Sequence, residues 1–239
     1  MAGGLIGQMA RERTFRWIVR GVFWTGLLYT YLAIFRQPAF APYRFLLENL
    51  FLAYVPVELS FHLEGKTPRV VFWAVFAVWF LFYPNAPYML TDFFHLALCD
   101  PYILRPDGAR TGLLRPDMRM WAMFANMSAL ALFCTFVGIL SMHRVVSALL
   151  KRFGRWTMCW QAALVLVVTT AASVGIYLGR FPRLHTAHLV TRPVETANKL
   201  LSSTWDLRLL EFVVMLTALQ MAVWGLLLLL RAAPSRNGG

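Results

Sequence analysis

The sequence predicts an all-α membrane protein, a polytopic transmembrane bundle of about six helices. Of its 239 residues, 59% are hydrophobic and only 14% are charged, whereas a soluble domain of this size carries about a quarter of charged residues. Apolar runs close to the roughly 20 residues that cross the hydrocarbon core recur about six times. Runs this long and continuous suit helices, which pair their own backbone groups in lipid, better than barrel strands.

The expected spans cover about residues 17–35, 45–61, 70–90, 120–142, 160–178 and 212–230. The membrane domain then comprises residues 17–231, between a basic cytoplasmic tail at 1–16 and a second cytoplasmic tail at 232–239. The first run lacks the small-residue site of a cleaved signal peptide, so we expect it to be retained as a helix.

A short interfacial helix is expected in the loop between the fifth and sixth spans. Four residues recur there at helical spacing: Val194, Ala197, Leu201 and Trp205. The tryptophan suits the aromatic belt of the membrane surface. The segment therefore favours a helix that lies on the membrane rather than across it.

The net charge of +12 comes from basic residues at the ends of the spans, with no basic domain between them. This distribution favours anionic membrane lipids, and not nucleic acid, as partners. A membrane-protein partner or a second copy of the chain also stays open. Lys and Arg divide almost evenly between the two sides, but four arginines flank the first span. We therefore expect a multi-pass protein of the cell membrane with cytoplasmic termini.

Polar residues converge on one face of the expected bundle. Consecutive spans run in opposite directions, so the starts of the second and sixth spans meet the ends of the third and fifth. The polar side chains of these four segments are Glu48, Asn49, Asn85, Tyr88, Asp92, His95, Tyr177, Arg180 and Asp206. The sequence thus predicts a shared polar site at one end of the bundle.

Two prolines, Pro84 and Pro87, interrupt the third span within FYPNAPYMLTDFFHL. Each lacks an N–H and disfavours helix in the preceding residue. If an α-helix resumes afterwards, one face carries a stripe of polar residues, namely Asn85, Tyr88, Asp92 and His95. In the alternative interpretation, Asn85 caps the broken helix while Asp92 and His95 are hydrated residues at the membrane interface.

In the fifth span, Ala171, Gly175 and Gly179 recur every four residues and predict a close approach by another helix. Tyr177 and Arg180 point to a different face. Arg180 either joins the polar site or extends to the headgroups, as arginine at the end of a span commonly does.

The second span carries two carboxylates, Glu48 and Glu58. Acidic residues on membrane helices usually face the protein interior and mark a functional path. Glu48 is expected at the polar site. Glu58 lies near the opposite end, where pairing with Lys66 or Arg69 is the simpler interpretation.

A metal site has little support in the sequence. His185 and His188 could join Asp92 and His95, but neutral interfacial histidines are the commoner explanation. The three cysteines have no metal-type spacing and are odd in number. No metal and no cofactor is predicted.

The stretches FYPNAPYMLTDFFHL and GIYLGRF together resemble the paired signature of a bacterial multi-pass membrane family catalogued as domain of unknown function 1361. The similarity extends to LLENLFLAYVP and covers roughly residues 44–193. The motif positions that the resemblance implies are Asn85, Pro87, Tyr88, Asp92, Tyr177, Gly179 and Arg180. Members typically continue with asparagine, tryptophan and aspartate, where this chain has LHTAHLV. The family has no established activity, so the resemblance implies a fold and a site without a reaction.

The function we expect is binding or modifying an anionic lipid or envelope substrate at the extracytoplasmic helix ends. In an enzyme, Asp92 or Glu48 would be the general base and His95 an acid or base. The expected substrate-binding residues are Asn85, Tyr88, Tyr177 and Arg180, with the arginine as an anion clamp. Two alternatives stay open: a small transporter built on the broken third helix, and an accessory or structural subunit of a membrane complex.

Overall fold

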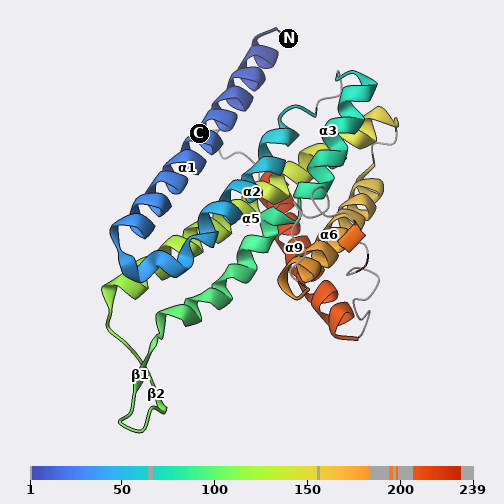
Figure 1. The fold of residues 1–239 in the computed structure, drawn as a ribbon. Helices are drawn as coiled ribbons and strands as arrows, with labels where there is room; N and C mark the ends of the chain where they lie inside the picture. Colours follow the sequence, from blue (N-terminus) through green and yellow to red (C-terminus); the bar gives the residue numbers. More distant parts are fainter. Residues whose placement is uncertain are drawn as a thin grey trace.

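The protein is seen in a computed structural model that describes residues 2–63, 67–154, 157–182, 194–195, 198 and 207–232. The described elements are, in order, α1 (Ala2–Arg36), η1 (Pro38–Tyr43), α2 (Phe45–Ser60), α3 (Arg69–Phe82), α4 (Asn85–Tyr88), η2 (Met89–Cys99), β1 (Tyr102–Leu104), β2 (Arg110–Leu114), α5 (Met118–Arg152), α6 (Met158–Arg180) and α9 (Leu207–Ala232). Helices dominate, as Figure 1 shows.

Among the described residues, five stretches are long and apolar enough to cross a membrane. They are Glu12–Arg36, Arg69–Leu98, Met118–Arg152, Met158–Arg180 and Leu207–Ala232. The predicted all-α polytopic bundle is therefore confirmed. The first of these spans is the continuation of a helix that begins at Ala2, so residues 2–16 of the tail expected at 1–16 belong to α1.

The second apolar run forms the shorter helix α2. Its 16 residues reach about 24 Å at 1.5 Å per residue, less than the roughly 30 Å of a hydrocarbon core. Leu46, Leu50, Ala53 and Val57 are buried along one face, at the spacing of a helix that packs on its neighbours. Of the six expected spans, this is the one that falls short of a full crossing.

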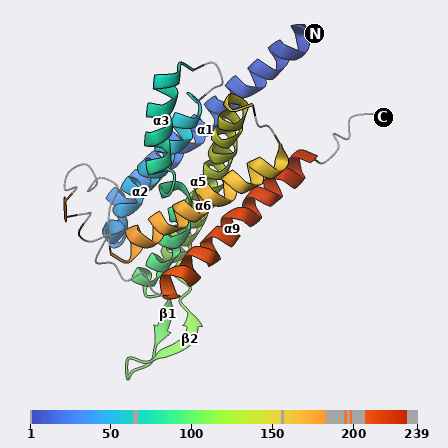
Figure 2. The ribbon, with the colours of Figure 1, turned by 90° about the vertical axis from the view of Figure 1, so that its right-hand side faces the viewer.

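The long elements alternate in direction, and this brings distant segments together (Figures 1 and 2). The starts of α2, α5 and α9 and the ends of η2 and α6 lie at the end of the bundle from which β1 and β2 project. We call this the hairpin end. The convergence of four segments predicted from the sequence therefore occurs there.

The β-hairpin was not anticipated from the sequence. β1 pairs antiparallel with β2. In the turn, Gly108 adopts a φ of +83°, which glycine tolerates best, and the Asp107 carboxylate accepts from the backbone N–H of Ala109 at 2.9 Å. Asp117, at the second copy of the tetrapeptide LRPD, accepts from the backbone N–H of Arg119 at 3.0 Å and caps α5. The aspartate of the first copy therefore stabilises the hairpin turn, and that of the second caps α5.

Two hydrophobic clusters fill the bundle, and the 35-residue helix α5 runs through both. Met127 of α5 lies in the cluster formed with α1, α2 and η2. Val145, further along α5, lies in the cluster formed with α3, α6 and α9. The Trp79 indole of α3 donates to the Ser141 hydroxyl at 2.8 Å, which fixes α3 on the same helix.

Small residues let two helices approach the break in the third span. A Cβ on Gly138 of α5 would lie 2.6 Å from the Cβ of Ala86, and one on Gly175 of α6 would lie 3.1 Å from Cγ of Pro84. Both distances are shorter than ordinary van der Waals contacts, so only glycine fits without displacement. The close approach predicted for Gly175 is confirmed, and its partner is the proline turn.

Glu58 is paired differently from the sequence interpretation. Its carboxylate accepts from Arg20 of α1, with Nε–Oε2 at 3.1 Å, and from the Tyr54 hydroxyl at 2.6 Å. Arg69 is not its partner. The Arg69 alternative is wrong because it considered only the next segment of the chain, whereas α1 packs along α2. Lys66 and the expected interfacial helix, apart from residues 194, 195 and 198, lie outside the described residues.

Candidate functional site

The third apolar run changes conformation at Pro84 and Pro87. Because proline has no N–H, α-helical hydrogen bonding cannot continue through either position. α3 ends at Phe82, and the Asn85 side chain donates to the Phe82 carbonyl at 2.9 Å. Asn85 thus closes the break, as in the alternative interpretation, and does not join the stripe expected with Asp92.

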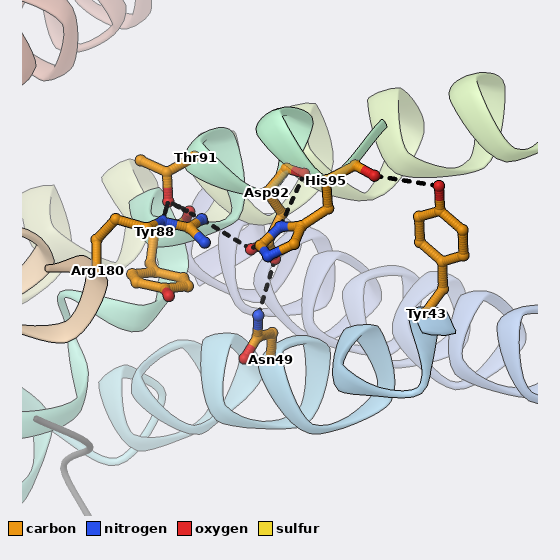
Figure 3. Close-up of polar contacts among 7 residues, drawn as sticks. All are labelled: Tyr43, Asn49, Tyr88, Thr91, Asp92, His95 and Arg180. Carbon is orange, nitrogen blue, oxygen red and sulfur yellow. Dashed lines mark hydrogen bonds and ion pairs between the residues drawn. The ribbon is translucent and has the colours of Figure 1, made fainter. Parts of the chain in front are cut away.

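Beyond the break, the chain continues as the 3-10 helix η2 and not as the α-helix that the stripe assumed. A 3-10 helix has three residues per turn, so side chains three positions apart stack along one edge. This register aligns Tyr88 with Thr91 and Asp92 with His95. These four residues meet Tyr43, Asn49 and Arg180 in what we call the Asp92 cluster (Figure 3).

Asp92 is the centre of this cluster and is only 1% exposed. Asn49 of α2 donates to its Oδ2 at 2.9 Å, and Nη2 of Arg180 donates to its Oδ1 at 2.9 Å. A buried carboxylate is costly unless it is paired and hydrogen-bonded. Both requirements are met here, and the contacts tie α2, η2 and α6 together.

Arg180 faces the bundle instead of extending to the headgroups, with 18% of its side chain exposed. Its Nε donates to the Thr91 hydroxyl at 3.1 Å, and its Nη2 contacts the same oxygen. Thr91 in turn donates to the Tyr88 carbonyl at 2.7 Å. The guanidinium carbon lies 4.6 Å from the centre of the Tyr88 ring, a cation–π contact. Contacts with Thr91, Asp92 and the Tyr88 ring therefore fix the orientation of the guanidinium.

His95 lies at the rim of the cluster with 31% of its side chain exposed. Its Nδ1 is 3.3 Å from the Asp92 carbonyl oxygen and 3.7 Å from Asp92 Oδ1. These acceptors favour the tautomer with the proton on Nδ1, which leaves the lone pair on Nε2. The ring also lies 4.3 Å from that of Phe45, and the Tyr43 hydroxyl donates to the His95 carbonyl at 3.1 Å. His95 is thus a positioned imidazole that can accept a proton.

Two predicted site residues point away from the cluster. Glu48 is exposed on α2, because residues adjacent in an α-helix are about 100° apart and its neighbour Asn49 faces inward. The Tyr177 ring lies 4.7 Å from Phe181 and 5.5 Å from Phe212. Tyr177 therefore belongs to an aromatic contact between α6 and α9, not to the polar cluster.

Thr91 and Tyr43 were missed by the sequence reasoning. Thr91 follows Tyr88 by three residues, a spacing that becomes informative only once the 3-10 register is known. Tyr43 is 1% exposed and lies in η1, between the first two expected spans, where the sequence reasoning assigned no site residue. Asn49 was expected at the shared face but was given no role.

The chemistry of the cluster is that of a charged pair with one acid–base group beside it. Within the described residues, no group of three or more His, Cys, Asp or Glu side chains is placed to hold a metal ion. His185, His188 and Asp206 lie outside the described residues. The groups present can neutralise charge, donate hydrogen bonds from the guanidinium and exchange a proton at His95 Nε2.

Comparisons with known proteins give one finding. Neither the curated proteins nor the solved structures contain a match to this chain. A family model described as "Protein of unknown function (DUF1361)" matches residues 48–223. That range runs from α2 into α9 and includes most of the Asp92 cluster. The chain therefore belongs to the DUF1361 family of proteins of unknown function.

Proposed function

We propose that this membrane protein binds, and at His95 acts on, an anionic lipid or envelope substrate at the hairpin end. We further propose that this end faces the outside of the cell membrane and that both termini are cytoplasmic. The observation that carries the proposal is the half-buried imidazole of His95 at the rim, backed by the buried Asp92–Arg180 pair.

An anion could be held by the edge of Arg180 that the cluster does not use. A guanidinium has five N–H donors in a planar fork. Its contacts with Thr91 and Asp92 use Nε and Nη2, and no described residue is hydrogen-bonded to Nη1. A phosphate or carboxylate at Nη1 would meet a charge-assisted donor, with His95 as the nearby proton acceptor.

A second candidate function is structural, and one observation favours it. Asp92 already neutralises Arg180 and is bonded to Asn49, so the cluster could serve to hold α2, η2 and α6 in an accessory subunit. The two functions differ in what His95 contributes. An imidazole at the rim is dispensable for the internal pair but required for binding and proton transfer.

Replacing the imidazole tests the proposal. We would purify wild-type protein and His95→Gln in mild detergent and quantify co-purifying anionic lipids by mass spectrometry. His62→Gln is the control for loss of an exposed imidazole: His62 follows the C-terminal end of α2, far from the Asp92 cluster, and its Nε2 lies 3.5 Å from Glu58 Oε1.

The expected result is depletion of at least one anionic lipid species in His95→Gln only, with an unchanged melting temperature. Identical lipid profiles in all three proteins would reject binding at His95. The structural function would then be the better account of the cluster.

A further inference from the structure

The Asp92 cluster is electrically balanced before any ligand enters it. It holds one carboxylate, that of Asp92, and one guanidinium, that of Arg180, with Oδ1 and Nη2 2.9 Å apart. Four further side chains in contact there are neutral: Tyr43, Asn49, Tyr88 and Thr91. A negatively charged ligand at Arg180 would therefore add one uncompensated charge beside a carboxylate that is 1% exposed, and such a charge is costly.

A proton can restore the balance, and the geometry favours one acceptor for it. Oδ2 of Asp92 accepts from the Asn49 amide at 2.9 Å, and Oδ1 accepts from Arg180 at 2.9 Å. A proton on either oxygen would compete with one of these donors. Nε2 of His95 meets no such competition, because no described residue is hydrogen-bonded to it. Its side chain is also 31% exposed at the rim, so solvent can deliver the proton.

The His95 ring is placed to become the second cation of the cluster. Its Nδ1 lies 3.7 Å from Oδ1 of Asp92, so a positive ring would share the carboxylate with Arg180. From the other elements, the described contacts are uncharged: the Phe45 ring of α2 at 4.3 Å, and the Tyr43 hydroxyl of η1 on the His95 carbonyl. An unperturbed imidazole changes charge between about pH 5 and 8. His95 can therefore supply one positive charge when a ligand requires it.

We infer that a singly charged anion, of the phosphodiester class found in lipid headgroups, binds at Arg180 together with one proton at His95. The inference rests on the function proposed for this site. An acid of the solvent donates the proton to the lone pair of Nε2. The imidazolium then balances Asp92 while the guanidinium serves the ligand, and no bond of the ligand breaks. Because one imidazole supplies one charge, a doubly charged headgroup would not be balanced in this way.

Calorimetry in two buffers measures this proton. The full chain in mild detergent would be titrated with dioctanoyl phosphatidylglycerol near neutral pH, in buffers of low and high ionisation enthalpy. The difference in heat gives the number of protons taken up for each lipid bound. The phosphodiester keeps a single charge in this range, so any pH dependence belongs to the protein. Dioctanoyl phosphatidylcholine is the lipid control. His62→Gln is the control variant, since His62 Nε2 also lies beside a carboxylate, 3.5 Å from Glu58 Oε1.

The wild-type protein and His62→Gln should take up about one proton with each phosphatidylglycerol, and their affinity should rise up to about tenfold for each unit by which the pH is lowered. His95→Gln should take up none and should bind with an affinity independent of pH. Asp92→Asn retains His95 but should also take up no proton, because the ligand alone then neutralises Arg180. His95→Gln decides the question even where Asp92→Asn does not fold, since the imidazole lies at the rim.

Three outcomes would contradict this inference, and they differ in what they leave standing. Preferential binding of phosphatidylglycerol without proton uptake by the wild-type protein would overturn the inference and leave the proposed function in place. Proton uptake that persists in His95→Gln would overturn the assignment to His95. Equal binding of phosphatidylglycerol and phosphatidylcholine would reject the proposed function, and the inference with it.

Discussion

The protein contains two arginine–carboxylate pairs that differ in their surroundings. At the hairpin end, Asp92 and Arg180 pair with 2% and 18% of their side chains exposed. At the opposite end, Glu58 and Arg20 pair with 31% and 29% exposed. Both pairs involve α2 or a residue bonded to it, and both have additional hydroxyl partners. The main difference between them is therefore access to solvent.

That difference changes what each pair does for the fold. Removing one partner of a buried pair leaves an uncompensated charge and is strongly destabilising. A half-buried pair that water and salt reach gains less, because they screen its charges. The Asp92 cluster therefore commits α2, η2 and α6 to one arrangement, whereas the more accessible Arg20–Glu58 pair contributes less to holding α1 against α2.

The largest effect expected is all-or-none labelling, which tests whether the two ends face opposite sides of the membrane. In a variant without Cys99, Cys134 and Cys159, Arg105→Cys in the hairpin turn should react completely with an impermeant maleimide applied to intact cells. In a second variant that retains only Cys159, this exposed thiol in the first turn of α6 should react only after the membrane is permeabilised. The reverse pattern would invert the orientation, and labelling of both in intact cells would place the two ends on the same side.

The next effect is the loss of the buried pair. Arg180→Gln should lower the free energy of unfolding by about 3–5 kcal/mol, because Asp92 is left charged and buried without its cation. Reversible unfolding in mixed micelles measures this change. The double variant Asp92→Asn with Arg180→Gln should recover part of the loss, since neither charge is then left alone. Strictly additive losses in the double-mutant cycle would contradict direct pairing.

The spans and the position of the buried pair are the parts of the structure that the sequence predicts well. The spans follow from run length and composition, because the cost of unpaired backbone in lipid permits few alternatives. The convergence of Asp92 and Arg180 follows from alternating helix directions alone. Neither inference needs the details of side-chain packing.

The remaining details depend on packing that the sequence does not reveal. The 3-10 register of η2 places Thr91 in the cluster. Adjacent residues of an α-helix are about 100° apart, so Asn49 of α2 faces the cluster and Glu48 does not. Asn85 was ambiguous because an amide beside a proline can either cap a helix or line a site. The partner of Glu58 came from α1, far away in the sequence, and only tertiary contact identifies it.

A smaller effect is expected where α5 packs against the proline turn of the third span. Gly138→Ala should destabilise the protein by about 1–3 kcal/mol, the usual cost of overpacking, because its Cβ would lie 2.6 Å from the Cβ of Ala86. Gly225→Ala is the control, since nothing lies within 4 Å of a Cβ there. The control should gain about 0.5–1 kcal/mol from helix propensity. Equal signs for the two changes would contradict the close approach of α5 to the proline turn.

The smallest effect should come from the half-buried pair of Glu58 and Arg20. Glu58→Gln retains an acceptor for the Tyr54 hydroxyl and removes only the charge that Arg20 faces, so we expect a loss of about 0–1 kcal/mol. That loss should vanish at about 1 M salt, where the screening length is roughly 3 Å. The loss in Arg180→Gln should persist under the same conditions, since ions do not reach a buried carboxylate. Equal losses for the two variants, with equal salt dependence, would show that both ends depend on their ion pairs alike.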